Sequence, residues 1–331
     1  MRAVKLVEAH RLETVELPDP EPHDAEVVIR VDGCGICGSD LSAYKVGLFS
    51  DNVPGHEFAG TIAAVGSGVD GWSVGDRAVV DPKLPCGVCE ECTSGNAHRC
   101  AFALTAGLGF ARPGGFAELV LAPAHRLHRL PDSLSLRDAC LVEPLSVAIH
   151  GVEKAPGLDS GPAVVIGLGP IGLFTVAVLA DRGVETIIGV DPVADRRRLA
   201  EQLGAHSTVA GAGDVRAAIS SAVRVYECSG HPDVLHTAAD LVAPGGALVL
   251  LGVPFGEAKV APLMWVTREI TVVGSIASSE DDFAAAIKML ARNRAVSSVA
   301  TRRVGFDQVP EVFEDLIAPS AGGKVVVDPA L

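Results

Sequence analysis

Residues 163–172 read AVVIGLGPIG, and this stretch decides how the second half of the chain folds. The apolar run AVVI is typical of a parallel β-strand that is buried on both faces. The pattern GxGxxG follows it. Gly167 allows a tight turn, Gly169 lets a pyrophosphate approach the backbone, and Gly172 lets the next helix pack closely on the strand. We therefore predict a strand, a phosphate-binding turn and a helix in direct succession.

Asp191 ends the next predicted strand, about 20 residues after the glycines, which is the context that the dinucleotide fingerprint requires. Its carboxylate is expected to accept hydrogen bonds from ribose hydroxyls and to repel a 2′-phosphate, so NAD is favoured over NADP. Arg196, Arg197 and Arg198 weaken this preference a little, because arginine pairs well with phosphate, although they also suit the solvated face of a helix. The residues predicted to bind the cofactor are Gly167, Gly169, Pro170, Ile171, Gly172, Asp191, Arg196, Gly252 and Val253.

Strands and helices alternate through this half of the chain. Strands are predicted at 186–190, 206–209, 223–228, 247–251 and 270–273, and helices at 195–203, 214–221, 232–241 and 281–292. Such alternation predicts an α/β fold with a doubly wound parallel sheet, a Rossmann domain, which we place at 149–289.

The chain has 331 residues, more than one hydrophobic core usually supports, so two domains are expected. Before residue 149, short alternating strands are separated by prolines and glycines. This pattern predicts a mostly β, partly closed barrel. Strand-like segments near the C-terminus are expected to return to it, giving a second domain of residues 1–148 and 290–331.

Residues 33–40 read GCGICGSD, and Gly55-His56-Glu57 follows soon after. Thiolate, imidazole and carboxylate are the ligands of zinc, and a catalytic zinc keeps one coordination position open. We predict that Cys37 and His56 hold such a zinc, with Glu57 behind it.

A second cysteine cluster predicts a structural zinc. Its members are Cys86, Cys89, Cys92 and Cys100. Four thiolates in one loop can close a tetrahedral site without an open position. Disulfides are the alternative in an oxidising compartment, and an iron–sulfur cluster is another, although its usual run has a shorter last gap followed by proline. The remaining cysteines, Cys34, Cys140 and Cys228, are expected to be small buried apolar residues.

The formal net charge of −14 disfavours nucleic acid and anionic membranes as partners. It also argues against a zinc-loop nucleic-acid-binding protein. The chain begins MRAVKLVEAH, without the apolar core of a secretion signal, so we expect a cytoplasmic protein.

Several motifs together resemble the zinc-dependent medium-chain alcohol dehydrogenases over nearly the whole chain. They are residues 35–40 (GICGSD), 55–57 (GHE), the four-cysteine loop, 143–147 (EPLSV) and the GxGxxG. The EPLS element is most similar to the polyol (sorbitol), 2,3-butanediol and threonine dehydrogenase branch, because the ethanol-active branch usually has cysteine there. The resemblance implies a GroES-like catalytic domain beside the Rossmann domain.

The resemblance also implies a role for each metal ligand. Cys37 and His56 ligate the catalytic zinc, and Glu57 is a ligand or lies just behind the metal. Glu143 is the remaining ligand, either directly or through water.

Three further roles follow from the same resemblance. Asp40 holds His56 in the correct tautomer, and the Ser39 hydroxyl takes the substrate proton. Ser42 stands where the family usually has a histidine that relays this proton to solvent. A serine hydroxyl is not a base near neutral pH, so the relay must use water or another group.

The predicted function is reversible oxidation of a secondary alcohol of a polyol, diol or cyclitol-like substrate, with zinc as Lewis acid and NAD as hydride acceptor. One alternative is threonine-type oxidation of an amino alcohol, with Asp51 as a candidate partner for the substrate ammonium. Another is a non-catalytic NAD-binding protein. Pocket residues are expected among Tyr44, Phe49, Phe110 and Trp265, and the resemblance suggests a homodimer or homotetramer.

Overall fold

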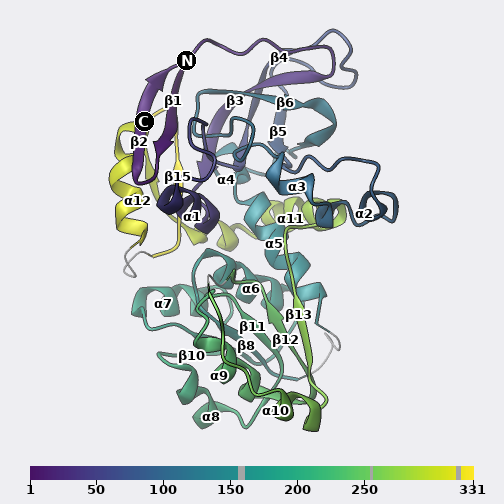
Figure 1. Cartoon of the computed structure of the whole chain (residues 1–331), viewed down its shortest axis with the longest axis vertical. Helices are drawn as coiled ribbons and strands as arrows, with labels where there is room; N and C mark the ends of the chain where they lie inside the picture. Colours follow the sequence, from purple (N-terminus) through teal and green to yellow (C-terminus); the bar gives the residue numbers. More distant parts are fainter. Residues whose placement is uncertain (156–160, 254–255, 318–321) are drawn as a thin grey trace. The chain divides into compact units, whose positions relative to one another are not determined.

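The computed structural model describes residues 1–155, 161–253, 256–317 and 322–331 (Figure 1). The chain forms two compact units. Unit 1 consists of Met1–Glu143, Ser279–Asn293 and Ala300–Leu331, and unit 2 consists of Pro144–Ser278 and Arg294–Val299. Among the described residues, no helix combines the length and the apolar character needed to cross a membrane.

Unit 2 contains the predicted parallel sheet. Its strands are β8 (Ala163–Ile166), β9 (Ile187–Val190), β10 (Ser207–Val209), β11 (Ala222–Glu227), β12 (Val242–Leu250) and β13 (Thr271–Gly274). They lie in the order β10-β9-β8-β11-β12-β13, and every described pair is parallel. The chain therefore runs outward from β8 in one direction and then from β11 in the other, which confirms the doubly wound sheet.

The helices and short 3₁₀ segments of this part of the chain are α5 (Val142–Glu153), α6 (Pro170–Asp181), α7 (Ala194–Gln202), η3 (Ala212–Asp214), α8 (Val215–Ala218), α9 (Val234–Leu241), α10 (Pro262–Thr267) and η4 (Arg294–Val299). Helices α6, α7 and α9 lie within a few residues of their predicted positions, whereas α10, η3 and η4 were not predicted. The helix predicted at 214–221 is wrong in length. Only α8 forms there, and Val215 is its one buried residue, so most of the segment has no apolar face to pack.

The close approach of α6 to β8 depends on Gly172. A Cβ atom at this position would lie 1.8 Å from the backbone oxygen of Gly167. All four residues of β8 are buried, as are eight residues of α6. The glycine therefore lets the first turn of the helix pack directly on the turn that follows the strand.

Unit 1 is mostly β, as the sequence predicted. The strands are β1 (Arg2–Glu8), β2 (Arg11–Glu16), β3 (Glu26–Gly35), β4 (Glu57–Val65), β5 (Arg77–Val80), β6 (Leu119–Pro123), β7 (Leu127–Arg129), β14 (Ala300–Val304) and β15 (Lys324–Val327). They pair antiparallel except for β14 and β15, which are parallel. One sheet has the order β14-β15-β3-β4-β5-β7, with β6 paired to β3, while β1 and β2 pair with each other. The last strand, β15, lies antiparallel to the end of β3.

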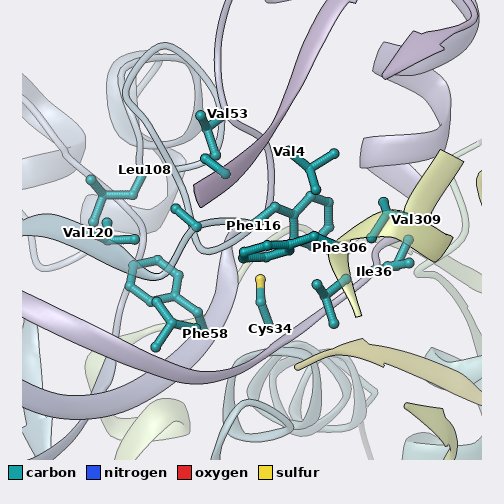
Figure 2. Packing of buried hydrophobic residues seen from close by; sticks show 14 of the residues in the cluster. Val4, Cys34, Ile36, Val53, Phe58, Leu108, Phe116, Val120, Phe306 and Val309 are labelled. Atoms are coloured by element: carbon teal, nitrogen blue, oxygen red, sulfur yellow. The ribbon is translucent and has the colours of Figure 1, made fainter. Parts of the chain in front are cut away.

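The helical segments of unit 1 are α1 (Gly38–Val46), α2 (Glu90–Thr93), η1 (Ala97–Arg99), α3 (Phe102–Thr105), η2 (Ala124–Arg126), α4 (Leu136–Ala139), α11 (Glu280–Arg292), η5 (Phe306–Gln308) and α12 (Val309–Ile317). They have three or four residues, except for α1 and α12 with nine residues each and α11 with 13. Strands and helices share one apolar core, in which Figure 2 shows Phe58, Phe116 and Phe306 with Cys34 among them. Cys34 and Cys140 are buried as predicted, whereas Cys228 is only partly buried.

The boundaries between the units differ from those expected at 148/149 and 289/290. The first lies at Glu143/Pro144 and the second at Ser278/Ser279. Helix α11 belongs to unit 1 because its side chains pack there. The Phe283 ring lies 4.7 Å from the ring of His128, and Glu280 is 3.2 Å from Arg126.

Candidate functional site

Three side chains with metal-binding atoms meet where β3 ends and β4 begins. Gly35 and Glu57 are register partners in the antiparallel pair β3–β4. Cys37 follows β3 at the N-cap of α1, and His56 immediately precedes β4. One ligand atom from each of Cys37, His56 and Glu57 lies within 4.8 Å of the other two. The strand pairing thus brings together the thiol, imidazole and carboxylate that suit zinc.

Asp40 contacts two members of this group. Its Oδ2 accepts a hydrogen bond of 2.8 Å from the backbone nitrogen of Cys37, and its Oδ1 lies 3.4 Å from Nδ1 of His56. That nitrogen is buried and makes no hydrogen bond of good geometry. Burial lowers the pKa of His56, but the charges of Asp40 and Cys37 outweigh it and raise the pKa well above 6.5. With Nδ1 facing Asp40, Nε2 is the nitrogen available to a metal.

Glu57 has one oxygen in an ion pair and one without a hydrogen-bond partner. Lys324 Nζ lies 2.6 Å from Oε1 of Glu57 and also donates to the carbonyl of Ile36 at 2.8 Å. Oε2 is buried and unpartnered, and a Cβ atom on Gly35 would lie 1.9 Å from it. Burial lowers the pKa of Lys324, but Glu57 raises it to about 12. Lys324 was not predicted to take part in this site. Its sequence context shows only a lysine at the start of an apolar strand.

The charges of His56 and Glu57 act on Glu143, but Glu143 is not a member of the group of Cys37, His56 and Glu57. It is 7% exposed. Burial, opposed by His56 and assisted by the charge of Glu57, raises the pKa of Glu143 to about 7. A buried carboxyl group of this kind loses its proton more readily when a cation lies nearby, because the cation stabilises the charged form. The burial and charge environment of Glu143 is compatible with an oxygen ligand, but the group of metal-binding atoms within 4.8 Å of one another does not include it, so its ligand role stays a prediction.

The two serines of α1 have different surroundings. Ser39 is exposed and lines a small cavity together with Asp40, Phe49 and Phe110. The Ser42 hydroxyl donates a hydrogen bond of 3.0 Å to the carbonyl of Gly38. Ser39 thus lies beside a cavity of about the size of one water molecule, whereas Ser42 is bound to its own helix.

Aromatic rings form one wall of this cavity. Phe110 stacks on His56 with ring centroids 4.8 Å apart, and Phe49 meets Phe110 edge to face. Tyr44 also lines the cavity. Of the four residues expected to line a pocket, Trp265 is the exception, because it belongs to α10 in unit 2 and packs against the core of that unit.

Asp51 does not contribute to this group. Its side chain is 85% exposed and lies 2.6 Å from Lys5. Asp51 forms an ion pair with Lys5 at the surface, so the structure does not support Asp51 as the partner of a substrate ammonium.

The four-cysteine loop forms a second metal-binding group. Ligand atoms of Cys86, Cys89, Cys92 and Cys100 all lie within 4.8 Å of one another. The sulfur of Cys92 is 3.5 Å from that of Cys89 and 4.0 Å from that of Cys86. These separations suit a tetrahedral centre with metal–sulfur distances of about 2.3 Å.

The electrostatics of the loop favour a thiolate. Backbone N–H groups of Val88 and Cys89 lower the pKa of Cys86 to about 6. None of the eight cysteines forms a disulfide in the structure.

The predicted cofactor site in unit 2 has an open turn and a buried acid. Gly167 adopts φ +87°, where L side chains are strained, and a Cβ atom on Gly169 would meet nothing within 4 Å. Helix α6 begins at Pro170, with Ile171 in its first turn. Helix N-termini attract phosphate, so the turn fits a pyrophosphate.

Asp191 lies just beyond β9 and is 2% exposed. It accepts hydrogen bonds of 2.8 Å from the backbone nitrogens of Leu168 and Val193. Arg196 lies 3.4 Å from its Oδ2. These contacts fix the carboxylate beside the glycine-rich turn. Gly252 and Val253 follow β12 after Leu251, at the same carboxyl edge of the sheet.

Two family descriptions match this chain. Residues 23–132 match the alcohol dehydrogenase GroES-like domain, and residues 170–292 match the zinc-binding dehydrogenase family. The chain is similar to D-altritol 5-dehydrogenase of Agrobacterium fabrum, with 34% identity over 83% of this chain and 84% of that protein. It is also similar to D-xylulose reductase A of Aspergillus niger, with 31% identity over 93% and 91%.

A solved structure agrees with the sequence matches. A zinc-binding dehydrogenase from Sinorhizobium meliloti 1021, bound to NADP, has a TM-score of 0.90 and 31% identity, covering 99% of each chain. Together with the strand order, the two cysteine-containing groups and the glycine-rich turn, these matches identify the fold and the chemistry. The chain belongs to the zinc-dependent medium-chain alcohol dehydrogenases, enzymes that act on CH–OH groups.

Proposed function

We propose that this enzyme catalyses reversible hydride transfer between NAD(H) and a secondary alcohol of a polyol, diol or cyclitol. The observation that carries the proposal is the convergence of Cys37, His56 and Glu57 within 4.8 Å. These residues lie in the same chain as a glycine-rich turn with a buried acid beside it. A protein that only bound NAD would have no use for the first of these features.

Cys37 and His56 would hold the catalytic zinc, which when bound supplies Lewis-acid polarisation of the alcohol oxygen. Asp40 keeps Nδ1 of His56 turned toward itself, so that Nε2 faces the metal. The Ser39 hydroxyl would relay the proton of the alcohol, accepting it while passing its own hydroxyl proton to water. Ser42 is bound to Gly38, so water in the cavity beside Ser39 is the proposed route by which the proton leaves.

The two glutamates are proposed to differ in role. Glu57 already has a cationic partner in Lys324, so it would stay behind the metal. Glu143 would provide the third protein ligand, directly or through water, since burial leaves its carboxylate ready to pair with a cation. The thiolates of Cys86, Cys89, Cys92 and Cys100 would bind a second, structural zinc.

NAD is the proposed cofactor, although a similar structure binds NADP. The support is Asp191, whose buried carboxylate would accept hydrogen bonds from ribose hydroxyls and repel a 2′-phosphate. Arg196 is already 3.4 Å from that carboxylate, which reduces its capacity to hold a phosphate.

A polyol or sugar-like substrate is proposed because relatives act on D-altritol and D-xylulose by name. Threonine-type oxidation has less support, because Asp51 pairs with Lys5 at the surface. We also propose a cytoplasmic homodimer or homotetramer. The eight free cysteines suit a reducing compartment.

The experiment is a screen of the zinc-loaded enzyme for NAD reduction, read by absorbance, over polyols, diols, cyclitols and amino alcohols. Turnover of a secondary hydroxyl in one of the first three classes is the expected result. Turnover of amino alcohols alone would replace this proposal with the threonine-type alternative. A protein that binds NADH and zinc but oxidises none of them would contradict it.

A further inference from the structure

Glu227 is a buried carboxylate for which the proposed mechanism has no role. It is the last residue of β11 and is 4% exposed. Its Oε1 accepts hydrogen bonds from the backbone nitrogens of Ser229 at 2.7 Å and Gly230 at 3.1 Å, and from the hydroxyl of Ser229. One oxygen thus gathers three donors and fixes the turn that follows the strand.

This turn touches the loops on both sides of it. A Cβ atom on Gly167 would lie 2.6 Å from the backbone nitrogen of Ser229. A Cβ atom on Gly252 would lie 2.2 Å from the backbone nitrogen of Gly230 and 2.6 Å from Oε2 of Glu227. The turn therefore packs backbone to backbone against the first glycine of the phosphate-binding motif and against the loop after β12.

The backbone of Glu227 makes a second connection. Its carbonyl oxygen accepts hydrogen bonds from the backbone nitrogens of Leu251 and Gly252, each at 2.9 Å. Glu227 therefore uses its side chain to hold the loop after its own strand and its main chain to hold the loop after the next strand.

The place of these loops in the sheet points to a ligand. The chain leaves β8 in one direction and β11 in the other, so the sheet reverses its order between these two neighbouring strands. In open parallel sheets, ligands bind at the carboxyl edge at such a reversal point. Gly167 follows β8 and the Glu227 turn follows β11, so they form the two sides of that position.

We infer that Glu227 is a positioning residue for the dinucleotide: it sets the loops after β11 and β12 so that their backbone can receive the cofactor beside the glycine-rich turn. This inference rests on the proposed function, because it takes NAD as the ligand of unit 2. The glutamate does not touch the reacting atoms, and it acts through Ser229, Gly230 and Gly252.

The geometry explains why a carboxylate is used. Gly230 nitrogen lies 3.1 Å from Oε1 and 3.3 Å from Oε2, so both oxygens face donors. A glutamine would keep one acceptor but would place an amide NH₂ group against a backbone N–H group. Alanine would remove every acceptor and leave the Ser229 nitrogen, the Ser229 hydroxyl and the Gly230 nitrogen without this partner, so the turn would no longer be held to the end of β11. The expected order of cofactor affinity is Glu, then Gln, then Ala.

The test is titration of the zinc-loaded enzyme with NADH, followed by NADH fluorescence, for wild type, E227Q, E227A and the control E185A. Glu185 is an exposed glutamate of the same unit. We expect E227A to bind NADH about tenfold or more weakly, E227Q about threefold, and E185A like wild type, with unchanged zinc content in all. We also expect KM for NAD to rise in E227A more than kcat falls.

A purely structural glutamate would give a different result. E227A would then melt at a lower temperature yet bind NADH within about twofold of wild type when measured well below its transition, and this result would overturn the inference. If E227A does not fold, E227Q and S229A decide, since each removes only part of the contacts. NADH binding equal to wild type in both variants would also overturn it. If the wild-type protein bound no NADH, this result would instead contradict the proposed function.

Discussion

The Nζ atom of Lys324 lies 2.6 Å from Oε1 of Glu57, and both side chains are almost completely buried, at 2% and 0% exposure. They are 267 residues apart in sequence. The pairing of β15 with the end of β3 brings them together, since Val326 is the register partner of Gly35. A segment from the C-terminus therefore supports a carboxylate of the candidate metal centre.

Replacing Lys324 with methionine should destabilise the metal-free protein strongly, because Glu57 would remain as a buried charge without its partner. We expect a loss of about 3 to 5 kcal/mol in the free energy of unfolding by urea. Zinc loading should recover part of it, since the metal offers Glu57 another cation. The control K45M changes an exposed lysine and should stay within about 0.5 kcal/mol.

The double variant E57Q/K324M tests the cause of that loss. It removes both charges, so it should recover most of the stability. A loss in K324M of under about 1 kcal/mol would show that the ion pair does not hold Glu57 in place.

Neither tyrosine should ionise at the usual pH of about 10 while the protein is folded. Burial and the hydrogen bond to Glu314 raise the pKa of Tyr44 to about 12, and burial raises that of Tyr226 further. These are the only two tyrosines, so phenolate absorbance reports both. Above pH 10 the folded state binds more protons than the unfolded state, so stability should fall as pH rises toward 12.

The measurement is a pH titration of phenolate absorbance in parallel with urea unfolding. Y44F should lose part of the fall in stability between pH 10 and 12. A phenolate signal that rises near pH 10 in folded protein would contradict the burial of these hydroxyls.

Replacing Asp191 with asparagine should change the choice of cofactor. Asparagine keeps a carbonyl acceptor for the Leu168 nitrogen but removes the charge that repels a 2′-phosphate. We expect the ratio of kcat/KM for NAD to that for NADP to fall about tenfold or more, as measured by initial rates. The control D195N removes an exposed charge on α7 and should leave the ratio unchanged. An unchanged ratio in D191N would assign cofactor choice to other residues.

Replacing Cys89 with serine should remove one zinc per chain and leave the other. The loop would lose its metal cross-link, so the melting temperature should fall by about 2 to 4 °C for each kcal/mol lost. The control C228S changes a cysteine outside both groups. Full zinc content with unchanged melting in C89S would mean that the four thiols do not bind metal.

The sequence was sufficient to predict those sites whose residues lie close together along the chain. The spacing of residues within short segments predicted that Asp191 lies beside the GxGxxG turn and that the four loop cysteines lie together. In the structure, Asp191 accepts a hydrogen bond from Leu168 of that turn, and the four sulfurs lie within 4.8 Å of one another. Cys37 and His56 were predictable for a related reason, because β3 and β4 pair directly.

Other features depend on long-range packing and could not be predicted. The side chain of Lys324 has a role only after β15 pairs with β3. Glu227 ends an apolar strand, and a glutamate there is also typical of a surface position until its donors are known. The position of α11 within unit 1 depends on contacts of Phe283 and Glu280 with residues far away in sequence.

The central claim is that Cys37 and His56 hold a catalytic zinc, and the most direct measurement is the zinc content of C37A beside its rate of NAD reduction. Wild type should contain about two zinc ions per chain, one for each of its two metal-binding groups. C37A should contain about one and lose about a thousandfold or more in turnover while still binding NADH. A folded C37A protein that kept both ions, or that turned over the alcohol at the wild-type rate, would contradict the account.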